Sequence, residues 1–90
     1  MITSIIKRDG RVVLYDESKI AAAILKAMEA GGEGNAADAA KVANAVQAQL
    51  EEAFKDTPPK IENIQDTVER ELMRAGYDES AKRYILYRAN

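Results

Sequence analysis

The chain has 90 residues, enough for one small domain, and its 47% hydrophobic and 31% charged composition is typical of a folded globular protein. A net charge of −2 excludes nucleic-acid binding through a general excess of positive charge. The chain contains neither cysteine nor histidine, which excludes disulfides and cysteine-based zinc sites and removes the usual general base near neutral pH. We therefore expect no catalysis by this chain alone and no metal site built from its side chains.

Charge is distributed unevenly along the chain. Residues 1–26 carry five basic and three acidic side chains, residues 27–57 carry two and six, and the last third is balanced. An anion is therefore attracted to the N-terminal third. No apolar run approaches the roughly 20 residues that a bilayer span requires, and no signal peptide precedes the first predicted strand. We expect a cytoplasmic protein with neither membrane nor nucleic acid as its partner.

Residues 3–7 and 11–15 are predicted to form two short β-strands, because both are rich in β-branched residues. Asp9 and Gly10 lie between them, and this dipeptide favours a tight type I′ turn in which both residues have positive φ. A β-hairpin is therefore expected at the N-terminus.

The predicted hairpin is basic. Lys7, Arg8 and Arg11 surround the turn, and Lys19 follows in the first turn of the next element. On pattern alone, a solvated turn whose charges protect an edge strand is the more economical interpretation. The alternative is an anion site in which the arginines offer planar forks to phosphate oxygens.

Four amphipathic helices are predicted after the hairpin, over residues 17–30, 36–54, 61–75 and 78 to the chain end. Asp16, Asn35 and Asp78 are the expected N-caps, three glycines in residues 31–34 end the first helix, and Gly76 follows the third. A short third strand beside the hairpin is considered for residues 55–60, which contain two consecutive prolines. The predicted fold is mainly α: a four-helix bundle capped by a β-hairpin or three-stranded sheet, in one domain over residues 1–90.

Several side chains carry two interpretations. Ile5, Val13 and Ile20 are ordinary core residues by pattern, but they could wall an apolar slot for a flat ring. Gln65 reads as a surface glutamine, and Arg88 either faces solvent or reaches the same anion as Lys7. The pair Glu69 and Glu71 is expected to face solvent.

Four segments together resemble one family. They are residues 5–13 (IIKRDGRVV), 16–20 (DESKI), 61–69 (IENIQDTVE) and 75–88, which begins AGY and ends AKRYILYR. In this order, and over essentially the whole chain, they are similar to the ATP-cone, the regulatory nucleotide-binding domain at the N-terminus of many ribonucleotide reductases. The resemblance implies a helical bundle with ATP or dATP held under the hairpin, ATP as activator and dATP as inhibitor.

The resemblance also implies which residues meet the nucleotide. Lys7, Arg8 and Arg88 match basic positions that face the triphosphate, with Mg²⁺ held through the phosphates. The remaining matches line or read the adenine or lie on the third-helix side of the pocket: Ile5, Val13, Asp16, Lys19, Ile20, Ile61 and Gln65. Two residues depart from the pattern, since Tyr15 stands where phenylalanine or another apolar residue is common and Ile61 where some relatives have Thr or Ser.

The implied partners are adenine nucleotides and the catalytic body of a ribonucleoside di- or triphosphate reductase, from whose N-terminus we expect this domain to be excised. Oligomerisation driven by dATP is a further implication. Two alternatives are an ATP-cone from a nucleotide-responsive repressor of reductase genes and a small helical interaction module without a ligand.

Overall fold

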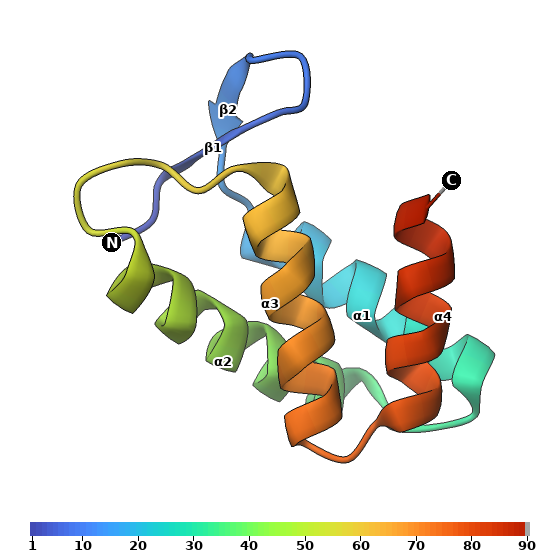
Figure 1. The fold of residues 1–90 in the computed structure, drawn as a ribbon. Helices are drawn as coiled ribbons and strands as arrows, with labels where there is room; N and C mark the ends of the chain where they lie inside the picture. Colours follow the sequence, from blue (N-terminus) through green and yellow to red (C-terminus); the bar gives the residue numbers. More distant parts are fainter. Residues whose placement is uncertain (90) are drawn as a thin grey trace.

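The computed structural model of the protein describes residues 1–89 and has four helices below a small antiparallel sheet (Figure 1). The elements in chain order are β1 (Ser4–Ile6), β2 (Val12–Leu14), α1 (Glu17–Gly31), α2 (Ala36–Ala53), α3 (Ile61–Arg74) and α4 (Asp78–Ala89). The prediction of a mainly α fold, a helical bundle capped by an N-terminal hairpin, is confirmed.

The hairpin pairs Ile5 with Val13 at its centre, so these two side chains lie on the same face of the sheet. Its turn differs from the predicted type I′ turn, because Gly10 has a φ of +88° but no residue other than glycine has positive φ within residues 1–89. The Gly10 N–H donates to the Lys7 carbonyl, and the Lys7 N–H donates to the Arg11 carbonyl. This is a three-residue loop closed by a left-handed glycine, the next most common hairpin connection.

The prediction of a third strand over residues 55–60 is wrong, because the sheet has two strands within residues 1–89. An isolated parallel bridge links Ile6 to Lys60, and the Ile6 N–H donates to the Pro59 carbonyl at 2.9 Å. Pro58 and Pro59 have no N–H of their own, so the segment can accept from β1 but cannot continue a ladder. The contact nevertheless fixes the hairpin against the start of α3.

The four helices close into a ring in which α1 packs on α2 and α4, and α3 packs on the same two helices. The predicted apolar stripes form the core, which is buried inside this ring. Its fully or almost fully buried members include Ile24, Ala27, Met28, Ala39, Val42, Ala43, Val46, Leu50, Ile64, Val68 and Leu72.

The predicted N-caps are confirmed for the first two helices. The Asp16 carboxylate accepts from the Ser18 N–H, and Asn35 and Asp38 exchange side chain–backbone hydrogen bonds in a capping box. Asp78 is instead the first residue of α4, and the Tyr77 carbonyl accepts the first helical bond from Ala81.

Glu33, from the α1–α2 loop, supplies the cap that α4 does not obtain locally. One oxygen of this carboxylate accepts from the Ser80 N–H at 2.8 Å and from the Ser80 hydroxyl at 2.7 Å. The hydroxyl bond and the backbone bond hold the pKa of Glu33 below its usual value. A carboxylate at a helix N-terminus is also favoured by the helix dipole.

The two flanks of the apolar stripe on α3 are less solvated than predicted. Glu71 is 6% exposed and lies 3.4 Å from Arg74, and Glu69 is also shielded from water, so both were wrongly expected to face solvent. Because α3 lies between α2 and α4, side chains flanking its apolar stripe are covered by its neighbours. Ala75 follows the last residue of α3 as its C-cap and is exposed.

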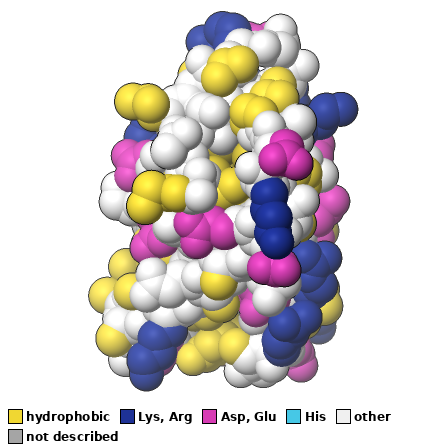
Figure 2. All heavy atoms as spheres, turned by 90° about the vertical axis from the view of Figure 1, so that its left-hand side faces the viewer, with side chains coloured by type: hydrophobic (Ala, Val, Ile, Leu, Met, Phe, Trp, Pro, Cys, Tyr) yellow, Lys and Arg dark blue, Asp and Glu magenta, His cyan; other side chains and the backbone are white. Residues whose placement is uncertain are grey.

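The surface mixes charged and apolar side chains. In the space-filling view, hydrophobic side chains lie among charged ones, and basic side chains sit at the top of the molecule over the hairpin (Figure 2). Val12 and Leu14 of β2 are strongly exposed on the outer face of the sheet. No helix within the described part of the chain is long and apolar enough to cross a membrane.

Candidate functional site

Two cavities adjoin beneath the hairpin. One, of about 400 Å³, lies between the hairpin turn, the start of α3 and the end of α4. The other, of about 230 Å³, lies between the inner face of the hairpin, α1 and α3. Lys7, Ile61 and Gln65 line both, so the two cavities are neighbours that share one wall.

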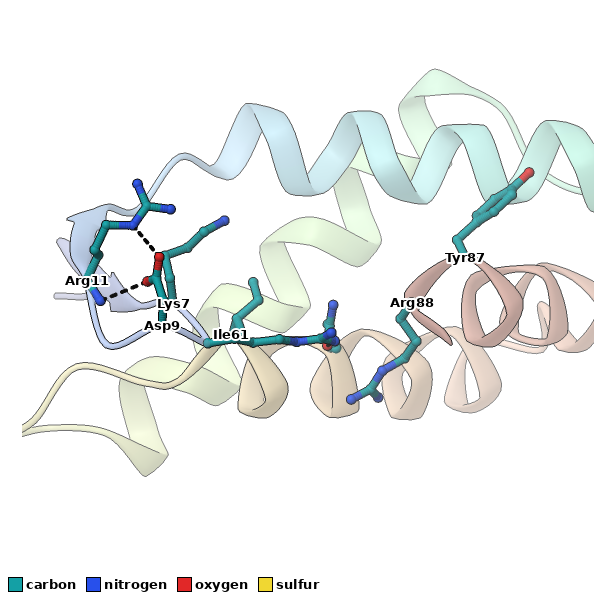
Figure 3. Close-up of a pocket in the computed structure, with 8 residues that line it drawn as sticks. Lys7, Asp9, Arg11, Ile61, Tyr87 and Arg88 are labelled. Atoms are coloured by element: carbon teal, nitrogen blue, oxygen red, sulfur yellow. Dashed lines mark hydrogen bonds and ion pairs between the residues drawn. The ribbon is translucent and has the colours of Figure 1, made fainter. Parts of the chain in front are cut away.

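The first cavity is cationic. Lys7, Arg8 and Arg11 line it from the hairpin, and Arg88 lines it from α4. Figure 3 shows the labelled hairpin residues at one end, Arg88 at the other and Ile61 of α3 between them. The Tyr87 ring points toward α1, where the Lys26 ammonium lies 5.4 Å from its centroid.

The hairpin cations differ in how strongly they are engaged. Arg11 pairs with Asp9 at 2.7 Å, and its hydrogen bonds hold the pKa of the Asp9 carboxyl below its usual value. Arg8 reaches α3 loosely, with Nη2 3.3 Å from Gln65 and Nε 3.6 Å from Glu62. The ammonium of Lys7 forms no ion pair within residues 1–89.

Arg88 is held more tightly than Arg8. Its Nη1 donates to Asp66 at 2.7 Å and to Glu69 at 2.8 Å, and these bonds raise the pKa of the Arg88 guanidinium. The side chain is 19% exposed, against 59% for Arg8. Arg88 is therefore a fixed positive charge at the α4 side of the cavity.

The second cavity is mainly apolar. Ile5 and Val13 enter it from the inner face of the sheet, and Ile20 and Ala23 enter it from α1, three residues apart on one helix face. Asp16 and Lys19 line it as well, and the Lys19 ammonium forms no ion pair among the described residues. A flat, apolar group with a few polar atoms suits such a cavity.

Asp16, which lines this cavity, uses only one of its two carboxylate oxygens in hydrogen bonds among residues 1–89. Its Oδ1 takes hydrogen bonds from the Ser18 hydroxyl and N–H, which hold the pKa of the Asp16 carboxyl below its usual value. Its Oδ2 accepts no hydrogen bond within the described residues. The carboxylate thus combines a structural role at the start of α1 with an unused oxygen at the site.

Tyr15, which follows β2, is one of the residues that line the apolar cavity. Its hydroxyl is buried and finds no hydrogen-bond partner within residues 1–89. Burial, together with the charges of Glu17 and Glu51, raises the pKa of Tyr15 to about 12. The phenol therefore stays protonated at neutral pH.

A family match accompanies this geometry: the ATP cone domain model aligns with residues 3–90. This chain belongs to the ATP cone domain family. The family supports a nucleotide-binding regulatory role, and it agrees with the resemblance seen in the sequence.

Curated relatives of the cone domain are ribonucleotide reductases. The chain is 42% identical over 93 residues to a vitamin B12-dependent ribonucleoside-diphosphate reductase of Thermoplasma acidophilum, an alignment covering 98% of this chain and 12% of that protein. It is 38% identical over 94 residues to a ribonucleoside-diphosphate reductase subunit alpha of Chlamydia muridarum, covering 94% of this chain and 9% of the relative. It is 36% identical over 88 residues to an anaerobic ribonucleoside-triphosphate reductase of Salmonella typhimurium, covering 98% of this chain and 12% of the relative. The chain thus spans about a tenth of these relatives.

The structure brings all ten predicted site residues of the cone domain to the two cavities. The cationic one is lined by Lys7, Arg8, Ile61, Gln65 and Arg88, and the apolar one by Ile5, Lys7, Val13, Asp16, Lys19, Ile20, Ile61 and Gln65. Other lining residues were absent from the predicted set, among them Ala23 and Tyr84. Helical spacing from Lys19 and Ile20 gives a signal for Ala23, whereas Tyr84 reaches the cavity only through the packing of α4.

Proposed function

We propose that this chain is a regulatory, non-enzymatic domain that binds ATP as an activator and dATP as an inhibitor of a ribonucleotide reductase. The observation that supports this most directly is the junction of a cationic and an apolar cavity at Lys7, Ile61 and Gln65. An adenine nucleotide has the same two parts, a flat base and a polyanionic tail. Family membership favours this ligand class.

In this proposal the adenine lies in the apolar cavity between Ile5, Val13 and Ile20, with the free oxygen of Asp16 accepting from its amino group. The triphosphate lies among Lys7, Arg8 and Arg88. Lys19 adds a further positive charge beside Lys7 at the apolar cavity.

Mg²⁺ is expected to accompany the triphosphate. Within residues 1–89 no group of three or more carboxylates could hold a metal ion by itself. The ion would therefore take its ligands from phosphate oxygens and water, as magnesium commonly does.

ATP and dATP differ only at the ribose 2′-hydroxyl, so opposite effects require differential affinity for two states of the parent protein. Gln65 lines both cavities, and we expect its amide to lie beside the ribose that joins base and phosphate. The reductase relatives favour a reductase parent over a repressor. The domain would then act in the cytoplasm on an attached catalytic body, with dATP promoting assembly.

Isothermal titration of the 90-residue chain with ATP, dATP and GTP, each with Mg²⁺, tests the proposal. We expect saturable heat with both adenine nucleotides below millimolar concentration and weaker binding of GTP. A ligand-free interaction module would give no heat with any of the three. Absence of heat with ATP and dATP would therefore contradict the proposed function.

A further inference from the structure

Arg88 belongs to α4 but is anchored on α3. Within residues 1–89 its side chain donates two hydrogen bonds, to Asp66 and to Glu69, and both come from Nη1. The two carboxylates are three residues apart and so share one face of α3. The Arg88 and Glu69 side chains are 19% and 18% exposed, so this anchor is largely shielded from water. Figure 3 shows Arg88 extending from α4 toward α3.

The two bonds to α3 leave part of the Arg88 guanidinium group without a partner among the described residues. Arginine has five N–H donors in a fixed fork, and Nη1 carries two of them. Within residues 1–89, Nε and Nη2 of Arg88 donate no hydrogen bond, so the edge that can bind a phosphate group in a bidentate manner is free. Arg8 is the reverse case, because its weak contacts to Gln65 and Glu62 use Nη2 and Nε.

We propose that Asp66 and Glu69 are positioning residues of the nucleotide site: they hold Arg88 through Nη1 and leave its Nε–Nη2 edge to a phosphate group. This inference rests on the proposed function, since it requires a polyphosphate in the cationic cavity. An arginine without an anchor must lose its rotamer freedom when the ligand binds, whereas an anchored one has lost it on folding.

The two carboxylates also place negative charge near the phosphates, and the test must separate this effect from positioning. The double variant Asp66→Asn/Glu69→Gln removes both charges but keeps an oxygen acceptor at each position. The double variant Asp66→Ala/Glu69→Ala removes the same charges and the acceptors. Titration with Mg-ATP should give a Kd roughly 3- to 10-fold higher for the alanine pair than for the amide pair. Equal Kd values for the two pairs would overturn the proposal.

The Arg88→Ala background shows whether the effect passes through Arg88. There we expect the alanine and amide pairs to bind Mg-ATP equally, because no guanidinium remains to be positioned. A difference that persists without Arg88 would also overturn the proposal. Single Glu69→Ala and Glu69→Gln variants provide the same comparison if a double variant fails to fold, as judged by helical circular dichroism.

A control uses an ion pair of α4 that lines neither cavity, between Glu79 and Lys82 at 3.4 Å. Glu79→Ala and Glu79→Gln should bind Mg-ATP with the same affinity as each other. Failure of the unmodified chain to bind Mg-ATP would overturn the proposed function together with the positioning role. Binding by the unmodified chain, with equal affinities for the alanine and amide pairs, would overturn only the positioning role.

Discussion

At the hairpin end of the bundle, Lys7, Arg8 and Arg11 lie in the loop that joins the two strands. At the opposite end, the α1–α2 loop lies against the start of α4 (Figure 1), where Glu33 accepts from Ser80. Among the described residues Lys7 forms no ion pair, and Arg8 makes only weak contacts with Glu62 and Gln65. Glu33, in contrast, gives one oxygen to two hydrogen bonds from the fully buried Ser80.

Close packing reinforces the contact between Glu33 of the α1–α2 loop and Ser80 of α4, which we call the fastened end. A Cβ on Gly31 would lie 3.0 Å from the Ser80 nitrogen, and one on Gly34 would lie 2.5 Å from the sulfur of the buried Met28. The hairpin end has no comparable constraint at Gly10, where a Cβ would meet no atom of residues 1–89 within 4 Å. This small domain therefore separates its stabilising contacts from the charges that it leaves available to a ligand.

The largest expected effect is on binding at the hairpin end. The double variant Lys7→Glu/Lys19→Glu should weaken ATP binding at least about 100-fold, because two attractions to the nucleotide become repulsions. Titration calorimetry measures the affinity, and circular dichroism should show unchanged helicity. A matched control, Lys55→Glu/Lys82→Glu, makes the same change in net charge outside both cavities. If both double variants bind ATP alike, the assigned site is wrong.

The fastened end should respond in stability instead. Gly34→Ala should lower the free energy of unfolding by about 2 kcal/mol, since it combines a positive φ with a clash against Met28. Gly32→Ala is the matched control, because Gly32 has the same φ of +71° but open space around it, and should cost about 1 kcal/mol. Denaturant unfolding measures both. Equal losses of unfolding free energy in the two variants would contradict the clash with Met28. A change in ATP affinity in either folded variant would contradict the separation of stabilising contacts from the binding site.

Base selectivity should depend on Asp16. Asp16→Asn keeps a good N-cap for α1 but replaces the free carboxylate oxygen with an amide donor. We expect ATP affinity to fall about tenfold and GTP affinity to rise, because guanine carries a carbonyl where adenine carries the amino group. Competition between the two nucleotides measures the ratio. An unchanged ratio would show that Asp16 does not contact the base.

A smaller effect is expected at the boundary between the site and the core. Tyr15→Phe should raise the free energy of unfolding by about 1 kcal/mol, because it removes a buried hydroxyl that lacks a partner within residues 1–89. Tyr87→Phe, at a ring that is 40% exposed, is the control and should change stability little. Lower stability of Tyr15→Phe would mean that its hydroxyl is satisfied.

The pKa of Tyr15 adds a pH dependence. Because the pKa is raised from 10.0 to about 12 on folding, the unfolded chain ionises first. The stability that depends on a protonated Tyr15 phenol is therefore complete below pH 10 and is lost as pH rises toward 12. Thermal melts between pH 10 and 12 should show a steeper decline of the melting temperature for the unmodified chain than for Tyr15→Phe. Parallel declines would contradict the raised pKa of Tyr15.

Local signals in the sequence predicted much of the fold. The hairpin, the helix boundaries to within one or two residues, and the caps at Asp16 and Asn35 all depend on neighbours in the chain. The turn type was wrong because Asp9 and Gly10 were both given positive φ, whereas Gly10 alone adopts it in this loop. The resemblance of separated segments was needed to collect the ten candidate site residues in one place.

Contacts between distant residues could not be predicted. The Glu33 cap on Ser80 spans 47 positions, and the anchor of Arg88 on Glu69 depends on how α3 and α4 pack. Glu69 and Glu71 look solvent-facing in a helical pattern, because periodicity does not show how far neighbouring helices cover the flanks of an apolar stripe. Which distant residue each charged side chain contacts therefore could not be predicted from the sequence.

Titration of isotopically labelled protein with Mg-ATP, followed by amide NMR, tests whether the nucleotide binds in the two cavities at the hairpin end. We expect the largest changes in amide chemical shift at Lys7, Val13, Lys19 and Gln65, around both cavities, and small changes at Glu33 and Ser80 at the fastened end. Shifts confined to the fastened end, or none at saturating nucleotide, would contradict it.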